Sequence, residues 1–465
     1  MKVAVVGGGV AGLTAALELS DLGAEVIVLE AAPRLGGKVH GVDLAGFGLD
    51  VGAESVLATA PEGEASPTLE LLDRLDRPAV PPEPVRAQLL VDGTVRPVPP
   101  SLVGVPFDAD DLVDLLTPDG LARARREPEV DAPPLDHDVA IGDLVADRFG
   151  AEVVDRLLEP MLGGVYAGHA RELSFAGVAP ALWQRVRGGG SISAHARAAR
   201  SPTTPGQPRR SPLVGTPGGI HGVVAALAET LCTAGVEVRT GATVRSLSRT
   251  GAGWQLVWGP TINERVLDVD AVVLATPAAA TARLLADVAP AAATELAQVS
   301  YASVAVVTVL ATGLTIDGSG LLVPPGELPT IKAFTHSSRK WGWVRERLDR
   351  AHGAEHDVVR ISIGRAGGEH QLHLDDDQLL ARTLAETAQV PGWAEARVVA
   401  GHVQRWGGGL PQYAVGHPER MARATAAIAE LPGLAACGAV WQGPGIAACL
   451  RTARAAARAV RDRSD

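Results

Sequence analysis

The chain opens with a strand–helix–strand pattern. Residues 3–6 and 26–29 are uninterrupted apolar segments, as expected for strands that are buried on both faces. Between them, residues 13–22 place apolar side chains at helical spacing, and Gly23 ends the predicted helix. This order predicts two parallel neighbouring strands with the helix packed against their sheet.

A similar pattern returns in the middle of the chain. A predicted helix over residues 223–231 precedes a strand over residues 236–238. Short β-branched or alternating segments predict further strands at residues 244–247, 254–257 and 271–274, and Pro277 prevents the last of these from continuing. We therefore expect a second α/β unit here.

The segment between these two units has a different character. Residues 88–95 predict a hairpin with Asp92-Gly93 as its turn. Residues 112–182 predict helices, divided by a connector over 127–138 that contains Pro and Asp. Residues 187–212 are rich in Gly, Ser, Pro and Arg, so we expect a mobile loop there.

The last third of the chain predicts an antiparallel sheet and a final helix. The predicted strands are residues 302–311, 330–335, 358–363 and 397–403, with a helix over 376–390 between the last two. An Ala-rich helix over residues 443–461 begins with Gly443-Pro444-Gly445.

Composition and charge exclude several classes of protein. The 465 residues are 46% hydrophobic and 20% charged, which is too apolar for a disordered chain. A net charge of −11 argues against non-specific nucleic-acid binding, and an aromatic fraction of 3% argues against a base-stacking surface. No apolar segment approaches the length of a membrane span, so we expect at most peripheral membrane contact.

Cysteine and histidine usage adds two expectations. The three cysteines form no CxxC pair, which suits a reducing compartment and predicts a cytoplasmic protein. The histidines show no spacing typical of metal ligands, so no metal is expected.

A glycine-rich turn after the first strand carries the clearest chemistry. Gly7, Gly9 and Gly12 fit the pattern GxGxxG between a strand and a helix. The helix N-terminus offers N–H groups and partial positive charge to a pyrophosphate. Glu30, at the end of the second strand, can accept hydrogen bonds from ribose hydroxyls. The pattern predicts a dinucleotide site but does not separate NAD from FAD.

A second glycine pair favours FAD. Gly36-Gly37-Lys38 follows the ribose position, and at this point the sequence resembles the flavin-containing amine oxidase superfamily. Lys38 stands where Arg is usual, and it supplies a point charge but not a two-pronged hydrogen-bonding group. The resemblance extends to segments 48–55, 216–238 and 438–446. It implies non-covalent FAD held by Gly7, Gly8, Gly9, Val10, Ala11, Gly12, Glu30, Ala31, Gly37, Lys38, Gly52, Ala53, Glu54, Ser55, Val238, Trp406, Pro444, Gly445 and Ile446.

Four other stretches are similar to the porphyrinogen oxidases of haem synthesis, in particular to the Gram-positive type that oxidises coproporphyrinogen III. They are residues 159–168, 331–341, 359–365 and 410–417. The sequence departs from that family at His169 (usually acidic), Pro444 (often Val) and Ala447-Ala448 (often Pro-Asp).

The resemblance implies an α/β fold in three parts. They are a discontinuous Rossmann-like FAD-binding domain (1–85, 211–285 and 406–465), a substrate domain with a mixed or antiparallel sheet (86–101 and 286–405) and a helical insertion (102–210).

The resemblance also implies the reaction. Three rounds of hydride transfer to the flavin remove six electrons from coproporphyrinogen III, with O2 as acceptor and hydrogen peroxide as product. The flavin supplies the chemistry, so no protein acid, base or nucleophile is assigned. Cations should meet the propionates of the substrate, and we select Arg86, Lys332 and Arg339 from a larger group that includes Lys340, Arg360, Arg365 and Arg405.

Several alternatives remain at this point. The substrate could instead be protoporphyrinogen IX, or the protein could be another flavin amine oxidase or desaturase, or a non-catalytic flavin-binding scaffold of the haem pathway. An arginine-rich stretch also has several readings. It could form a solvated loop, steer the anionic substrate, contact anionic lipid, or bind a haem-pathway partner such as ferrochelatase. Its members are Arg185, Arg187, Arg197, Arg200, Arg209 and Arg210.

Overall fold

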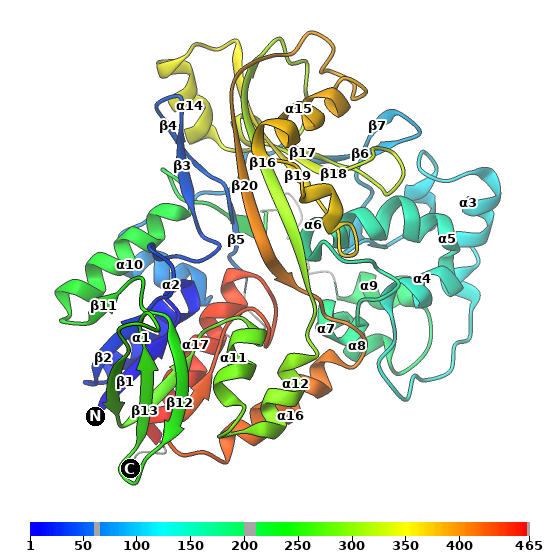
Figure 1. The fold of residues 1–465 in the computed structure, drawn as a ribbon. Helices are drawn as coiled ribbons and strands as arrows, with labels where there is room; N and C mark the ends of the chain where they lie inside the picture. Colours follow the sequence, from blue (N-terminus) through cyan, green and yellow to red (C-terminus); the bar gives the residue numbers. More distant parts are fainter. Residues whose placement is uncertain (60–65, 200–210, 463–465) are drawn as a thin grey trace.

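A parallel five-stranded sheet forms the base of the molecule in the computed structural model, which describes residues 1–59, 66–199 and 211–462. The strand order is β11-β2-β1-β15-β21 (Figure 1). All four pairings are parallel, as the opening pattern predicts. The strands are β1 (Lys2–Val6), β2 (Glu25–Leu29), β11 (Glu237–Arg239), β15 (Ala271–Leu274) and β21 (Leu434–Ala436).

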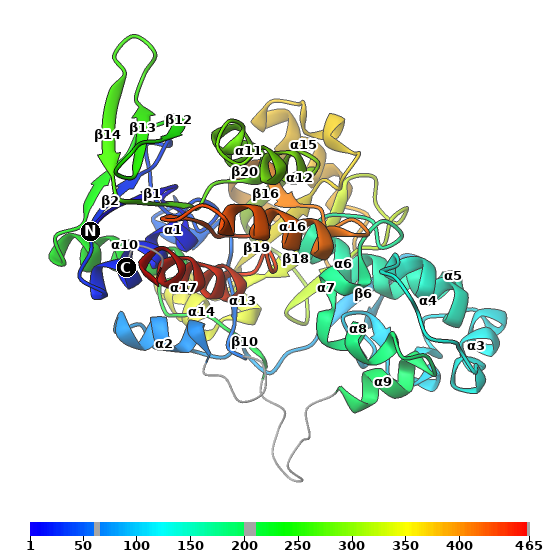
Figure 2. The same cartoon turned by 90° about the horizontal axis from the view of Figure 1, so that it is seen from below.

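Both faces of this sheet are covered, which explains its uninterrupted apolar strands. Val3 and Val5 join a core with helices on one face, whereas Ala4 and Val6 point into a second core on the opposite face. The first core lies under α1 (Val10–Asp21), α10 (His221–Thr233) and α17 (Ile446–Asp462), and α1 packs against both of the others (Figures 1 and 2). The second core lies under α11 (Ala278–Leu285), α12 (Pro290–Ala297), α16 (His417–Ala429) and a three-stranded sheet of β12 (Val244–Arg249), β13 (Trp254–Trp258) and β14 (Arg265–Val269).

A second, larger sheet rises above the first (Figure 1). Its order is β20-β16-β19-β18-β17-β6-β7, and the two longest neighbours are β16 (Tyr301–Thr312) and β20 (Arg397–Pro411). The remaining strands are β6 (Ala87–Val91), β7 (Thr94–Pro97), β17 (Gly320–Leu322), β18 (Ile331–His336) and β19 (His356–Ile363). The predicted hairpin over 88–95 is therefore confirmed as β6–β7.

This sheet is mixed and not purely antiparallel, because β6 pairs with β17 in parallel. The apolar pattern of the last third predicted only antiparallel strands, whereas the resemblance grouped residues 86–101 with 286–405 and allowed a mixed sheet, which the structure confirms. One face is covered by α15 (Asp376–Thr387) through an apolar core. The end of the other face packs on α14 (Gly342–Ala351) and the hairpin of β3 (Gly41–Leu44) and β4 (Phe47–Asp50).

The predicted helical region is also present, as a separate cluster on one side of the molecule (Figures 1 and 2). It contains α3 (Pro118–Ala124), α4 (Ile141–Phe149), α5 (Ala151–Val153), α6 (Glu159–Tyr166), α7 (Phe175–Val178), α8 (Pro180–Val186) and α9 (Ile192–Ala198). Helix α9 corrects the expectation of a mobile loop over 187–212 for residues 192–198, because Ser191 caps the helix and Ile192 and Ala196 are buried. Arg200, Arg209 and Arg210 of the arginine-rich stretch lie outside the described residues.

Short elements complete the chain. They are α2 (Pro67–Arg74), α13 (Ser337–Lys340), β5 (Val56–Leu57), β8 (Ser101–Leu102), β9 (Val105–Pro106), β10 (Leu213–Val214), the 3-10 helices η1 (Ala109–Leu112), η2 (Glu127–Glu129) and η4 (Glu369–Leu372), and the π-helix η3 (Val154–Leu158). Among the described residues, no helix combines the length and apolar character needed to cross a membrane.

Candidate functional site

A cavity of about 450 Å³ lies at the carboxyl end of the parallel sheet. Gly7 follows β1, Glu30 follows β2, and Ala275 follows β15, and all three line this cavity. Gly438 lines it from the segment after β21. In open parallel sheets, ligands bind outside the carboxyl ends of the strands, so this is the position expected for a cofactor.

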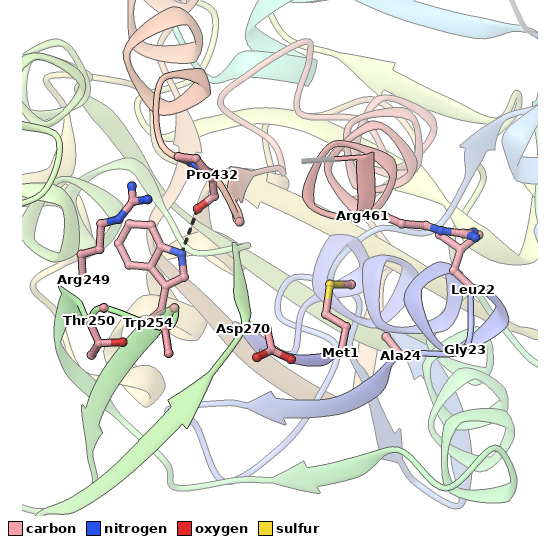
Figure 3. Close-up of a pocket in the computed structure, with 14 residues that line it drawn as sticks. Met1, Leu22, Gly23, Ala24, Arg249, Thr250, Trp254, Asp270, Pro432 and Arg461 are labelled. Carbon is pink, nitrogen blue, oxygen red and sulfur yellow. Dashed lines mark hydrogen bonds between the residues drawn. The ribbon is translucent and has the colours of Figure 1, made fainter. Parts of the chain in front are cut away.

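A larger cavity, of about 730 Å³, lies at the opposite edge of the same sheet (Figure 3). Met1, Ala24 and Asp270 stand just before β1, β2 and β15, so this cavity faces the amino ends of the strands. No helix begins among its lining residues, and its glycine turn over 251–253 joins two antiparallel strands and does not lead into a helix. Trp254 donates a hydrogen bond from its indole Nε1 to the Pro432 oxygen at 3.1 Å within its wall. We therefore place the candidate site in the smaller cavity.

The glycine-rich turn leaves open space in front of α1. A Cβ on Gly12 would lie 1.8 Å from the Gly7 oxygen, and Gly7 itself has φ +109°, so neither position accepts a side chain. At Gly9, a Cβ would meet no protein atom within 4 Å, and this residue lines the cavity just before α1 begins at Val10. The helix N-terminus thus faces a free concave surface that suits a pyrophosphate.

Glu30 is held rigidly at the edge of this surface. Its two carboxylate oxygens accept hydrogen bonds from the Gly8 N–H at 2.5 Å and the Ala32 N–H at 2.7 Å. Each carboxylate oxygen has a further lone pair, which leaves Glu30 able to accept from a sugar hydroxyl. The predicted ribose contact is therefore geometrically available.

Two cations come from the second glycine pair. Gly36 donates a hydrogen bond from its N–H to the Gly8 oxygen at 2.8 Å, which joins the two glycine turns. Lys38 lines the cavity, where the surrounding protein lowers the pKa of its ammonium group. Arg34 donates to the Gly37 oxygen at 3.0 Å, and its guanidinium lies 5.8 Å from the centre of the Trp406 ring. The positive charge gathered here suits a phosphate-containing ligand.

The opposite wall is built by the other end of the chain. Pro444 and Ile446 line the cavity where α17 begins. The Tyr413 hydroxyl donates to the Ala439 oxygen at 2.6 Å and accepts from the Gly443 N–H at 2.6 Å, which fixes the loop before the helix. The glycine turn of the first strand and the final helix therefore face one cavity, as the sequence predicts.

Most of the predicted cofactor residues line this cavity or support it. The lining residues are Gly7, Gly9, Val10, Ala11, Glu30, Ala31, Gly37, Lys38, Ala53, Trp406, Pro444 and Ile446. Gly8, Gly12 and Gly52 do not line the cavity but allow the close backbone packing that supports it, since a Cβ at each would come within 3 Å of other protein atoms. Ser55 and Gly445 are not among the residues that line it, and Val238 pairs with Val28 at the edge of the sheet.

Glu54 is placed differently from the prediction. Its carboxylate lies 3.1 Å from the Lys340 ammonium and 3.5 Å from the Arg360 guanidinium, and it accepts a hydrogen bond from the Ser337 hydroxyl. Burial alone would favour its neutral form, but the two cations outweigh burial and lower the pKa of Glu54 to about 2. Through these contacts, Glu54 connects the segment after β4 to β19 and α13 instead of lining the cavity.

The sequence reading missed several lining residues. They are Val6, Leu29, Gly36, Val39, Ala242, Thr243, Val244, Ala275, Thr276, Pro277, Ala280, Arg283, Leu284, Tyr301, Gly407, Gly408, Gly409, Gly438, Ala439, Val440 and Cys449. The lining residues that follow β15 could have been predicted from the sequence, because residues directly after a central parallel strand lie at the ligand-binding edge of the sheet.

The three predicted substrate cations lie in different surroundings. Arg86 is exposed and does not line the cavity. Arg339 donates to Asp357 at 3.0 Å. Lys332, in contrast, is buried on β18.

Within residues 1–59, 66–199 and 211–462, no group of three or more His, Cys, Asp or Glu side chains is arranged to hold a metal ion.

Comparison with known proteins gives these features a family. Residues 10–461 match the model of the flavin containing amine oxidoreductase family. A coproporphyrinogen III oxidase of Mycobacterium tuberculosis is 34% identical, over 98% of this chain and 96% of that protein. A protoporphyrinogen oxidase of Bos taurus is 28% identical, over 98% of each protein. A solved structure from Exiguobacterium sp. 255-15 superposes with a TM-score of 0.82 at 25% identity, covering 99% of this chain and 98% of that one. The chain therefore belongs to the flavin-containing amine oxidoreductase family, and its cofactor is FAD.

Proposed function

We propose that this protein is an FAD-dependent coproporphyrinogen III oxidase of haem biosynthesis. The observation that carries the proposal is the full-length similarity to coproporphyrinogen III oxidases, combined with a cavity whose two walls suit one dinucleotide. Bound FAD would supply the oxidising chemistry, which is the removal of six electrons from the porphyrinogen in three two-electron rounds with O2 as the final acceptor.

The chain's own residues hold and orient the cofactor in this proposal. The N-terminus of α1, with Gly9 at its first turn, receives the pyrophosphate, and Glu30 receives the ribose. Lys38 contributes positive charge. The start of α17 at Ile446 lines the same cavity, and a helix N-terminus placed there would stabilise negative charge on a bound flavin after reduction.

Two ionisable side chains of the cavity wall, Cys449 and Tyr301, remain neutral. Burial raises the pKa of the Cys449 thiol to about 11 and raises the pKa of Tyr301, so both are protonated at neutral pH. The Tyr301 hydroxyl accepts a hydrogen bond from the Ala278 N–H at 2.8 Å. These residues orient and shield the reacting carbon, and no side chain is needed to take a proton from it.

We also propose the three-domain division of the sequence prediction, with boundaries near residues 85, 101, 210, 285 and 405. We propose a cytoplasmic location.

The exposed Arg185 and Arg187 near the end of α8 are our candidates for contact with a ferrochelatase. Loss of binding in an Arg185→Glu/Arg187→Glu double variant, with porphyrinogen oxidation unchanged, would support that contact.

The decisive experiment is anaerobic mixing of the flavin-loaded protein with coproporphyrinogen III. We expect the flavin absorbance to bleach and, after air is admitted, porphyrin fluorescence to appear with release of hydrogen peroxide. A flavin that the substrate does not reduce would indicate a non-catalytic scaffold, and turnover of amines alone would indicate another amine oxidase.

The second candidate is protoporphyrinogen IX oxidation, favoured by the similarity to the bovine enzyme. Steady-state assays with both porphyrinogens separate the two. A kcat/KM for protoporphyrinogen IX equal to or above that for coproporphyrinogen III would reverse our assignment.

A further inference from the structure

Lys332 is a buried cation without an anion. Its side chain belongs to β18 and is only 2% exposed. Within the described part of the chain, its ammonium group has no hydrogen bond or ion pair. Burial lowers its pKa to about 7, and the positive charge of Arg365 contributes to this shift. A lysine in such a position is expected to have a partner that the protein alone does not provide.

Arg365 lies beside it and is also incompletely paired. One guanidinium nitrogen, Nη2, donates to the Val323 oxygen at 2.8 Å, whereas the buried Nη1 has no hydrogen-bond partner. A Cβ on Gly163 of α6 would lie 2.3 Å from this Nη1. The guanidinium therefore packs directly on the helix, at a position that has no side chain.

The acidic group that acts on Arg365 is already committed elsewhere. Glu159 acts on Arg365 electrostatically, but one of its oxygens lies 3.0 Å from His169 Nδ1 and the other accepts from the Ala170 N–H at 2.6 Å. The other ring nitrogen of His169 meets the Ala366 oxygen at 3.0 Å. The acid and its neighbours thus fix the loop that carries Arg365 and do not neutralise Lys332.

This cation pair is one layer of side chains away from the cofactor cavity. Ala366, next to Arg365, packs on a small apolar cluster that contains Ala167, Val304 and Trp406. Trp406 lines the cavity on the other side. A molecule that reacts at the cavity and extends past this cluster toward β18 and α6 would reach the pair.

From these contacts we propose that Lys332 and Arg365 form a binding site for one carboxylate of the substrate. The inference rests on the proposed function, since a porphyrinogen is the ligand that would bring the carboxylate. An anion between the two groups would satisfy the Arg365 Nη1 and the Lys332 ammonium together, and charge-assisted hydrogen bonds of this kind are the strong ones. Coproporphyrinogen III offers four propionates and protoporphyrinogen IX two, so both porphyrinogens carry the carboxylate that the pair binds.

The test uses Lys332→Met and Arg365→Gln in the flavin-loaded protein. We expect each variant to bind the product coproporphyrin III at least tenfold more weakly in a fluorescence titration. The KM for coproporphyrinogen III should rise by a similar factor, with kcat and flavin content within about twofold of wild type. Lys332→Arg should restore part of the affinity. Arg350→Gln, which removes one exposed cation from α14, is the matched control and should change nothing.

Two results would overturn the inference. Unchanged coproporphyrin III affinity in folded Lys332→Met would mean that the lysine is simply buried in its neutral form. Equal weakening in the Arg350→Gln control would mean that overall charge, and not this pair, attracts the substrate. Failure of the proposed function has a different signature, because wild type would then neither bleach its flavin with porphyrinogen nor bind coproporphyrin III.

Discussion

At the scale of single residues, Gly9 and Gly12 perform different tasks within one motif. Gly12 is required by the protein itself, because a Cβ there would overlap the Gly7 oxygen. Gly9 has φ −72° and ψ 174°, which any residue adopts, and a Cβ would meet no protein atom. Its lack of a side chain is therefore explained only by a ligand that approaches the backbone closely.

This difference predicts opposite outcomes for two alanine variants. Gly9→Ala should fold normally, with Tm changed by less than about 2 °C, and should lose most of its bound flavin. Gly12→Ala should destabilise the fold by about 3 kcal/mol or more. The ratio of flavin to protein absorbance and thermal unfolding measure the two effects.

The control is Gly222→Ala in α10, where a Cβ also meets no protein atom within 4 Å. It should retain both stability and flavin. Full flavin content in Gly9→Ala would place the pyrophosphate elsewhere.

Glu54 predicts a pH-dependent contribution to stability. Its folded pKa of about 2 lies below the ordinary value of 4.5, so the ionised form is stabilised by folding. The contribution, up to about 3 kcal/mol, is complete above about pH 5 and is lost as pH falls toward 2. The difference in unfolding free energy between wild type and Glu54→Gln should therefore be largest at pH 7 and shrink by pH 4 and below. A difference that does not change with pH in urea titrations would exclude this ion-pair role.

The residue scale also shows what a sequence can and cannot reveal. Gly7, Gly9 and Glu30 are close in the sequence, and their spacing alone predicts their common site. Glu54 is close in sequence to the same motif, yet its partners Ser337, Lys340 and Arg360 lie hundreds of positions away. Only the folded chain could show that this carboxylate joins two parts of the molecule.

At the scale of elements, α9 shows how a tertiary contact creates a helix in a segment of unfavourable composition. Glu127 is fully buried, and its carboxylate accepts hydrogen bonds from Ser191, Ile192 and Ser193. A negative charge at the first turn also stabilises a helix electrostatically. The local composition predicted a loop here. It could not reveal the helix, because the stabilising carboxylate lies more than sixty positions earlier in the chain.

We expect Glu127→Ala to loosen this helix. The variant leaves buried donors unsatisfied, which should cost about 2–4 kcal/mol and accelerate amide hydrogen exchange over 192–198 by at least tenfold. Exchange in α4 should change much less. The neighbouring exposed Glu129→Ala is the control. Equal protection of α9 in both variants would show that Glu127 does not hold it.

At the scale of the whole molecule, Tyr413 connects the helical cluster to the cofactor cavity. Its ring lies in the core of that cluster, 5.6 Å from the Tyr166 ring, while its hydroxyl bonds to Ala439 and Gly443 beside α17. The helical insertion thus helps to fix the start of the last helix.

Tyr413→Phe keeps the ring and removes only the two hydrogen bonds. We expect flavin affinity to fall about five- to fiftyfold, because the loop before α17 becomes less ordered, with a smaller effect on Tm. Tyr166→Phe is the matched control, since its hydroxyl has no hydrogen bond in the described part of the chain. Equal flavin affinity in both variants would contradict this role. Equilibrium titration of the apoprotein with FAD is the measurement.

The large-scale architecture was more predictable than its connections. Apolar periodicity predicted the five-stranded sheet's central strands, the hairpin β6–β7 and the final helix, because these depend on local pattern. The parallel edge between β6 and β17 depends on which distant segments meet, and residue spacing does not encode that. The cation pair Lys332–Arg365 is a similar case, since both were candidate cations, but only the burial of Lys332 and the packing of Arg365 against Gly163 distinguish them from exposed ones.

The two walls of the cavity come from opposite ends of the polypeptide, with Gly9 on one side and Ile446 on the other. During synthesis, a ribosome must release almost the entire chain before this site exists. Cofactor loading is therefore a late event in biogenesis. A product truncated before α17 would lack one wall of the cavity, and a product made without the flavin precursor would have both walls but no cofactor between them.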